Sequence, residues 1–310
     1  MRSCDGHAAL RPGVRHARAL CRQAAWCVLP ARVLLVLTSH KGIQMYESDG
    51  SIMVYWHALD ATEHPTAQAV FARGIAAASG RFICVGLSSG LVLVFDIPPK
   101  GTNVTVSEVL AEHSAAVTDI AAELGHDGAG DLVSADDSGA LCVWSSGEEF
   151  ALQRGGPGGA GIPCSCSSVK LWNGILAAGY GNGQIRLYEA ASGALRARVD
   201  AHARWIYALD VAPATGKLLS GAEDSFVHVW QLGRSPDTGD IEVGPGAPGA
   251  ARGGRPCACC SGAARPQIEH CHAECVPDTQ VCGARFCDAR GASFAVTGYD
   301  LAEIVRYSRA

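Results

Sequence analysis

Charged side chains are scarce in this sequence, and neither sign strongly predominates. Only 18% of the 310 residues are Asp, Glu, Lys or Arg, and the formal net charge is −5. Because there is no basic excess, we expect no general affinity for nucleic acid or for an anionic membrane surface. A hydrophobic fraction of 48% with so little charge is typical of a folded chain rather than a disordered one.

Long hydrophobic runs are also lacking. Runs such as residues 33–37 are far shorter than the roughly 20 residues that cross a bilayer, and no apolar segment of the signal-peptide type follows the first arginines. We therefore expect no transmembrane segment and a cytoplasmic location, with association to vesicles or membranes only through partners. In that compartment the 14 cysteines are expected to be reduced.

Acidic residues are missing between Asp5 and Glu47, whereas residues 1–25 carry five arginines. This bias resembles a mitochondrial transit segment, but such segments are usually serine-rich and Ser3 is the single serine here. We predict that residues 1–25 form an Arg-rich, disordered N-terminus and that residues 26–310 form one domain.

That domain contains a repeated pair of short, alternating strands. The clearest copy is residues 217–230, where a Glu-Asp-Ser turn separates an apolar strand from one that alternates Val227 and Val229, as in a β-hairpin. Six copies align by the aromatic residue that ends the second strand, namely Tyr46, Phe95, Trp144, Tyr188, Trp230 and Tyr307. The first four intervals are 49, 49, 44 and 42 residues, the length of one four-stranded blade of a WD-repeat propeller. We predict an all-β WD-repeat β-propeller with six recognisable blades.

The last interval is 77 residues long, and its excess has a visible cause. Residues 244–267 are rich in Gly, Pro and Ala and show no strand periodicity. We predict a low-complexity loop insertion at 244–267, placed before the last blade.

His202, Ser220, Asp224 and Trp230 have the spacing that typifies a WD repeat. A hydrolase triad also uses His, Ser and Asp, but in WD repeats these four residues form a structural network across one blade. We therefore predict a structural tetrad and no catalytic residue. Blade three repeats the pattern with His113, Ser134 and Trp144, and has Ser138 where aspartate is usual.

Cysteine and histidine are concentrated near the C-terminus and suit zinc as ligands. The set consists of Cys257, Cys259, Cys260, His270, Cys271, His272, Cys275, Cys282 and Cys287. No repeated Cys-x-x-Cys pair occurs in it, so we predict no metal and no cofactor. The alternative is a zinc-binding protein or an enzyme that uses this cluster or the central channel.

Trp205 and its neighbour Arg204 come just before a predicted first strand, at the rim of the propeller. Both residue types are frequent at protein-binding hot spots. We predict that they contact protein partners of unknown identity, and that the protein is a non-enzymatic interaction scaffold or signalling adaptor.

Several segments are typical of one family. They include Trp-Cys-Val-Leu-Pro at 26–30, Ala-Ala-Gly-Tyr-Gly-Asn-Gly-Gln at 177–184 and Cys-Gly-Ala-Arg-Phe-Cys-Asp at 282–288, together with residues 32–40, 42–48, 53–60, 68–74 and 298–304. On these segments the chain resembles the WD repeat-containing protein 54 family. The resemblance implies a seven-bladed ring. This chain departs from the family pattern before Trp26 and at 244–267. We therefore predict a seven-bladed ring that lacks its first blade.

Overall fold

The computed structural model describes residues 21–59, 72–123, 131–147, 149–155, 164–234, 241–242 and 268–308. Residues 1–20 and the predicted insertion at 244–267 lie outside these ranges. All regular structure in the described ranges is β-strand. In this part of the chain there is accordingly no helix of the length and apolarity needed to cross a membrane.

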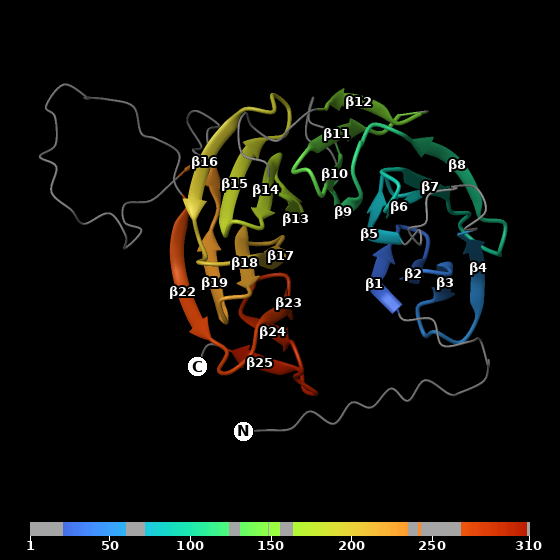
Figure 1. Ribbon diagram of the computed structural model, residues 1–310. Helices are drawn as coiled ribbons and strands as arrows, with labels where there is room; N and C mark the ends of the chain where they lie inside the picture. Colours follow the sequence, from blue (N-terminus) through green and yellow to red (C-terminus); the bar gives the residue numbers. More distant parts are fainter. Residues whose placement is uncertain are drawn as a thin grey trace, which may run out of the picture.

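The strands form six antiparallel sheets, which we call blades one to six (Figure 1). Blade one comprises β1 (Cys21–Val28), β2 (Val33–Ser39), β3 (Gly42–Glu47) and β4 (Met53–Ala58). Blade two comprises β5 (Ala72–Ala78), β6 (Phe82–Leu87), β7 (Val92–Asp96) and β8 (Thr105–Leu110). Blade three comprises β9 (Val117–Ala122), β10 (Leu132–Asp136), β11 (Leu141–Ser145) and β12 (Ala151–Arg154).

Blade four comprises β13 (Cys166–Trp172), β14 (Ile175–Tyr180), β15 (Gln184–Glu189) and β16 (Leu195–Asp200). Blade five comprises β17 (Ile206–Ala212), β18 (Lys217–Ala222), β19 (Phe226–Gln231) and β22 (Glu269–Cys275). Blade six has three described strands, β23 (Val281–Phe286), β24 (Ser293–Gly298) and β25 (Val305–Ser308). A short pair, β20 (Gly233–Arg234) and β21 (Ile241–Glu242), stands apart from the blades.

The first strand of each blade contacts the first strand of the next, in the order β1, β5, β9, β13, β17 and β23. These inner strands surround the centre, and the arc remains open between blade one and blade six (Figure 1). Trp26 and Val28 on β1 are 63% and 69% exposed, because they face away from blade two. The six-bladed WD-repeat propeller fold is confirmed.

The core is divided among the blade interfaces. Each of the five pairs of neighbouring blades shares one hydrophobic cluster, and the middle strands β6, β10 and β14 are buried along their whole length. A strand covered on both faces needs apolar residues at every position, which explains the unbroken run of apolar side chains and glycine in β6.

One boundary differs from the predicted one. Strand β1 begins at Cys21, so strand structure starts before the expected boundary at Trp26. The long connection that contains 244–267 precedes the last blade in the chain and joins β19 and β22, the third and fourth strands of blade five. Strand β22 escaped the sequence pattern because most of its side chains are exposed and few are apolar.

Candidate functional site

The predicted tetrad of blade five is assembled by β18, β19 and the residues around them. Trp230 Nε1 lies 3.0 Å from Ser220 Oγ, which lies 2.8 Å from His202 Nε2. His202 Nδ1 lies 3.0 Å from Asp224 Oδ1. An indole N–H can only donate and a carboxylate can only accept, so Trp230 donates to the serine oxygen and His202 Nδ1–H donates to Asp224.

The same connectivity occurs in a serine hydrolase, but this serine cannot act as a nucleophile toward a substrate. Ser220 is 0% exposed, and its oxygen already accepts the indole N–H. Burial alone would raise the pKa of Asp224, yet the hydrogen bond and charge of His202 and the N–H groups of Ala203 and Phe226 lower it. The four groups satisfy one another within the blade, as a structural network does.

Blade three contains the same network, with an acid that was not predicted. His113 Nε2 lies 2.7 Å from Ser134 Oγ, and Trp144 Nε1 donates to that oxygen at 3.0 Å. The acid is Asp136, whose Oδ2 lies 2.9 Å from His113 Nδ1, whereas Ser138 only donates to Asp136. The aspartate follows the serine by two residues instead of four, so a search at the usual position misses it.

Trp205 directly precedes β17 and is half buried. Its ring covers Gly181 in the turn that follows β14, where an added Cβ would come within 2.6 Å of the indole. It also stacks on Tyr207, with ring centroids 6.4 Å apart. Gly181 is therefore the residue that allows the indole to lie flat on the neighbouring blade.

Arg204 is more accessible than its neighbour. Its side chain is 66% exposed and lies 3.8 Å from Glu223, a surface ion pair that contributes little to stability. The guanidinium is thus available at the rim beside the half-buried indole.

A cavity of about 190 Å³ lies next to Trp205. Blades two to five each contribute the second residue of their inner strand, and three neighbouring residues complete the lining. The first group is Arg73, Thr118, Ser167 and Tyr207, and the second is Asp137, Ser165 and Trp205. The cavity therefore lies at one end of the inner strands, where the four blades meet.

The lining of this cavity combines aromatic rings with opposite charges. Ser165 Oγ is buried and has no hydrogen-bond partner among the described residues, so it is available to a ligand atom. Apart from Trp205, these residues were not predicted. Four of them occupy the same position, the second residue, in the inner strands of their blades. The sequence repeats were aligned on the hairpins and not on the inner strands, so this equivalence was not visible.

Acidic side chains of the inner strands are used to join blades. Asp119 on β9 accepts from the backbone N–H of Val169 at 3.0 Å and from Ser168 Oγ at 2.7 Å. Asp210 on β17 likewise accepts from the N–H of Phe286 at 2.8 Å. These carboxylates therefore link the inner strand of one blade to that of the next.

The Cys/His set is dispersed in the described part of the chain. Within the described ranges no three His, Cys, Asp or Glu side chains are arranged to hold a metal ion, and Cys257, Cys259 and Cys260 lie outside those ranges. An irregularity in the pairing of β22 at Cys271 separates the two histidines. His270 Nε2 lies 2.9 Å from His228 Nδ1. His272 Nε2 instead lies 3.3 Å from Glu274 Oε2, beside Val229.

Comparison with known proteins agrees with the repeat architecture. The family model described as WDR54 matches residues 5–259 and 258–310. WD repeat-containing protein 54 of Mus musculus is 61% identical over 290 residues, and its Homo sapiens counterpart is 60% identical over 291 residues. Each alignment covers 93% of this chain and 78% of the relative. The matched ranges include both segments that we expected to depart from the family, residues 5–25 and all of 244–267. This chain belongs to the WD repeat-containing protein 54 family.

Proposed function

We propose that the protein is a non-enzymatic scaffold or adaptor that binds protein partners at the rim around Arg204 and Trp205. The observation that carries the proposal is the cavity formed where blades two to five meet. Arg73 and Tyr207 line it from inner strands, and Trp205 lines it from the position directly before β17, next to the exposed Arg204. Aromatic and arginine side chains held on a rigid frame are the usual anchors of protein interfaces.

The repeat architecture supports the same function. WD-repeat proteins generally act as scaffolds for protein interactions, and propeller rims offer loops from several blades to one partner. The tetrads of blades three and five are internally satisfied, and all their members except Asp224 are buried. Neither they nor the dispersed Cys/His set favours the enzyme or zinc alternative. A cytoplasmic location remains part of the proposal, and fractionation of cells that express the tagged chain tests it.

Affinity capture followed by mass spectrometry tests the rim. We expect the double variant R204A/Y207A to capture each specific partner at least about fivefold less than the wild type does. The reason is that truncation of an anchor side chain often costs more than about 1 kcal/mol of binding free energy. These two side chains are accessible, so their loss should not disturb folding. The matched control is Arg198→Ala, an exposed arginine on the outer strand β16. Unchanged capture by R204A/Y207A would remove this rim from the function.

A further inference from the structure

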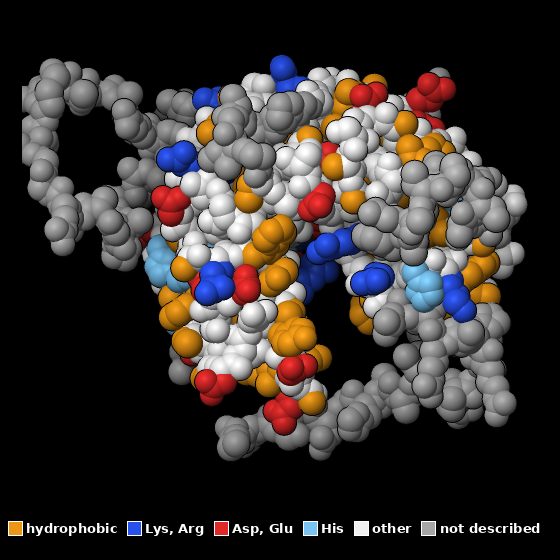
Figure 2. Space-filling model, in the orientation of Figure 1, with side chains coloured by type: hydrophobic (Ala, Val, Ile, Leu, Met, Phe, Trp, Pro, Cys, Tyr) orange, Lys and Arg blue, Asp and Glu red, His pale blue; other side chains and the backbone are white. Residues whose placement is uncertain are grey.

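The hollow centre of the arc carries charged side chains of both signs (Figure 2). The cavity of about 190 Å³ beside Trp205, which we call the inner-strand cavity, is lined by Arg73 on β5 and by Asp137, which directly follows β10. Both charged residues are exposed, and among the described residues neither makes an ion pair or a side-chain hydrogen bond. A ligand that pairs with both must carry an anionic and a cationic group.

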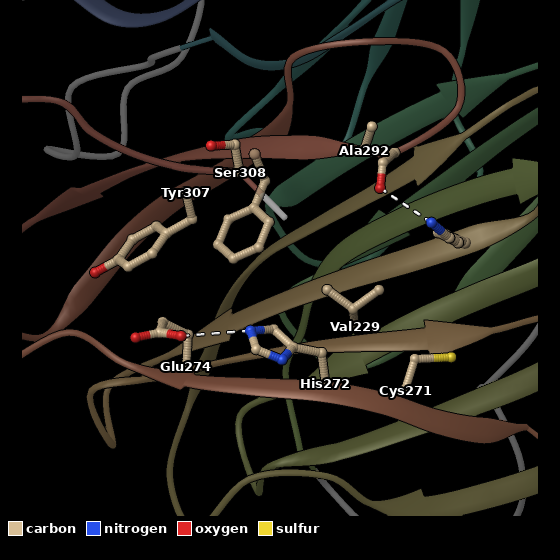
Figure 3. Close-up of a pocket in the computed structure, with 10 residues that line it drawn as sticks. Val229, Cys271, His272, Glu274, Ala292, Tyr307 and Ser308 are labelled. Carbon is tan, nitrogen blue, oxygen red and sulfur yellow. Dashed lines mark hydrogen bonds and ion pairs between the residues drawn. The ribbon is translucent and has the colours of Figure 1, made fainter. Parts of the chain in front are cut away.

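The larger cavity, of about 300 Å³ between blade five and blade six, differs in this respect (Figure 3). Its charged side chains are paired, since His272 lies 3.3 Å from Glu274 and Lys217 Nζ donates to the carbonyl of Gly291 at 3.2 Å. Of these two cavities, the inner-strand cavity is therefore the one that offers unpaired charges to a ligand.

Three hydroxyl groups also line the inner-strand cavity. Thr118 Oγ1 donates to the carbonyl of Cys166, and Ser167 Oγ donates to the carbonyl of Gly179 at 3.1 Å. Because their hydrogens are used within the protein, these two oxygens can only accept from a ligand, as an ammonium group requires. Ser165 Oγ is buried and has no partner among the described residues. A polar ligand atom would offset the free-energy cost of that unpaired hydroxyl.

Trp205 and Tyr207 form the aromatic part of the lining. Their rings stack, with centroids 6.4 Å apart and an interplanar angle of 29°, and Tyr207 is 37% exposed. The cavity volume of about 190 Å³ slightly exceeds the roughly 150 Å³ that accommodates a benzene molecule. The inner-strand cavity therefore has room for one aromatic side chain and a few polar atoms.

We propose that the inner-strand cavity binds a free amino acid with an aromatic side chain. The α-carboxylate pairs with Arg73 and accepts from the hydroxyl of Ser165, and the α-ammonium group pairs with Asp137. The ligand ring packs against Trp205 and Tyr207. This inference rests on the proposed function only in that the same cavity adjoins the protein-binding rim.

A segment of polypeptide matches the cavity less well than a free amino acid does. Within a chain the α-amino and α-carboxyl groups form uncharged amides, so the two charges would have to come from different side chains. Residues 60–71 lead into β5 and residues 156–163 lead toward β13, and neither segment contains a lysine or an arginine. The connections that adjoin the lining residues in the chain therefore lack the cation that would pair with Asp137.

Calorimetric titration of the full chain with L-phenylalanine tests the site, and we expect saturable binding. Phenethylamine lacks the carboxylate, and hydrocinnamate lacks the ammonium group. Each should bind at least about tenfold more weakly, because each leaves one charged side chain unpaired. Absence of saturable phenylalanine binding, or equal binding of the three compounds, would overturn the proposal.

Substitution of the charged residues assigns the two ends of the ligand. Arg73→Gln should weaken phenylalanine binding at least about tenfold but should not weaken phenethylamine binding, since that compound has no carboxylate to lose. Asp137→Asn should have the same effect on phenylalanine and should not weaken hydrocinnamate binding. The controls Arg198→Gln and Asp300→Asn, at exposed residues outside the lining, should bind like the wild type. Equal losses for phenylalanine and phenethylamine in R73Q would refute the pairing with Arg73.

Ser165→Ala separates ligand binding from folding. It should weaken phenylalanine binding about threefold or more without lowering the melting temperature, because the hydroxyl has no partner in the described part of the protein. A lower melting temperature with unchanged ligand binding would instead give this hydroxyl a structural role and contradict the proposal.

The single variant R204A separates this site from the protein-binding rim, because Arg204 does not line the cavity. It should bind phenylalanine like the wild type even where partner capture falls. A chain that captures partners but does not bind phenylalanine would overturn the amino acid site alone. A chain that binds phenylalanine while R204A/Y207A captures every partner normally would support the site and overturn the proposed function alone.

Discussion

Blades three and five contain the same four-residue network but obtain its acid from different places. In blade three the acid is Asp136, the last residue of β10, whose side chain is 0% exposed. In blade five it is Asp224, a turn residue whose side chain is 13% exposed. The two imidazole nitrogens and the serine keep the same contacts in both blades. The position of the histidine is therefore the fixed requirement, whereas the chain position of the aspartate can vary.

The largest expected difference between the two blades is in the loss of stability when the tetrad aspartate is replaced. Asp136 accepts from His113, from the N–H and hydroxyl of Ser138 and from the N–H of Ala140. Asp136→Ala should lower the free energy of unfolding by about 3–5 kcal/mol, because it leaves buried donors unpaired. Asp224→Ala should cost about 1–3 kcal/mol, because water can reach its donors. Urea denaturation of both variants measures the difference, and equal midpoints would refute the distinction.

A second change converts blade three to the arrangement of blade five. Ser138 follows Ser134 by four residues, as Asp224 follows Ser220. The double variant D136A/S138D should recover about 1–2 kcal/mol of the loss caused by D136A, because the new carboxylate can reach the His113 N–H. The double variant D136A/D137S is the control, since Asp137 makes no equivalent contact. No recovery would show that blade three requires the acid within its strand.

The stability of blades three and five should depend differently on pH, because the residue paired with the tetrad serine on the neighbouring strand differs. In blade five this is His228, and in blade three it is Cys142. Burial and the nearby His202 and His270 lower the pKa of His228 to about 4, with Asp224 acting in the opposite direction and His272 adding a smaller lowering. Because the folded pKa lies below the unfolded value of about 6.5, the unfolded chain binds more protons between these values. Stability should therefore fall as the pH falls from 6.5 toward 4.

His228→Cys, which installs the blade-three residue, should flatten this dependence. Hydrogen exchange of β19 at pH 7 and pH 5 measures it: wild-type protection should fall more between the two pH values than that of the variant. Strand β11, which contains Cys142, serves as the internal reference. Parallel pH profiles of wild type and variant would contradict the assignment to His228.

The smallest expected effect concerns the indoles. Trp144→Phe and Trp230→Phe each remove one N–H donated to a buried serine, at 3.0 Å in both blades. Each should cost about 1 kcal/mol, with no difference between the blades. Trp172→Phe is the control, because its N–H bonds to the partly exposed carbonyl of Pro213. If only one of the two variants lowered the melting temperature of the protein, the two networks would not be equivalent.

The propeller was predictable because its hairpins carry two independent signals. Alternating apolar residues and turn residues mark the first and second strands of each hairpin, and an aromatic closes each repeat, as at Phe95 and Trp144. The outer strand β22 carries neither signal, since its exposed face selects no apolar side chain. The sequence therefore placed the insertion before the last blade without showing that it joins the third and fourth strands of blade five.

The sites were harder to predict for a different reason. Asp136 was missed because the spacing rule describes one loop geometry, whereas a network depends on atoms that different loops can bring together. The cavity beside Trp205 draws one residue from each of several inner strands, and only the register of those strands shows that Arg73 and Tyr207 are equivalent. Residue types at fixed intervals along the chain do not contain that information.

The division of the core into five interfaces determines how this arc comes apart. Each blade is coupled only to its neighbours, so the free energy is a chain of nearest-neighbour terms. A closed ring has no ends, whereas an open arc has two, and among the described residues blades one and six each share a hydrophobic cluster with one neighbour. Unfolding should therefore begin at blades one and six and proceed blade by blade toward the middle of the arc. The tetrads of blades three and five lie inside that sequence and would be among the later parts to lose their structure.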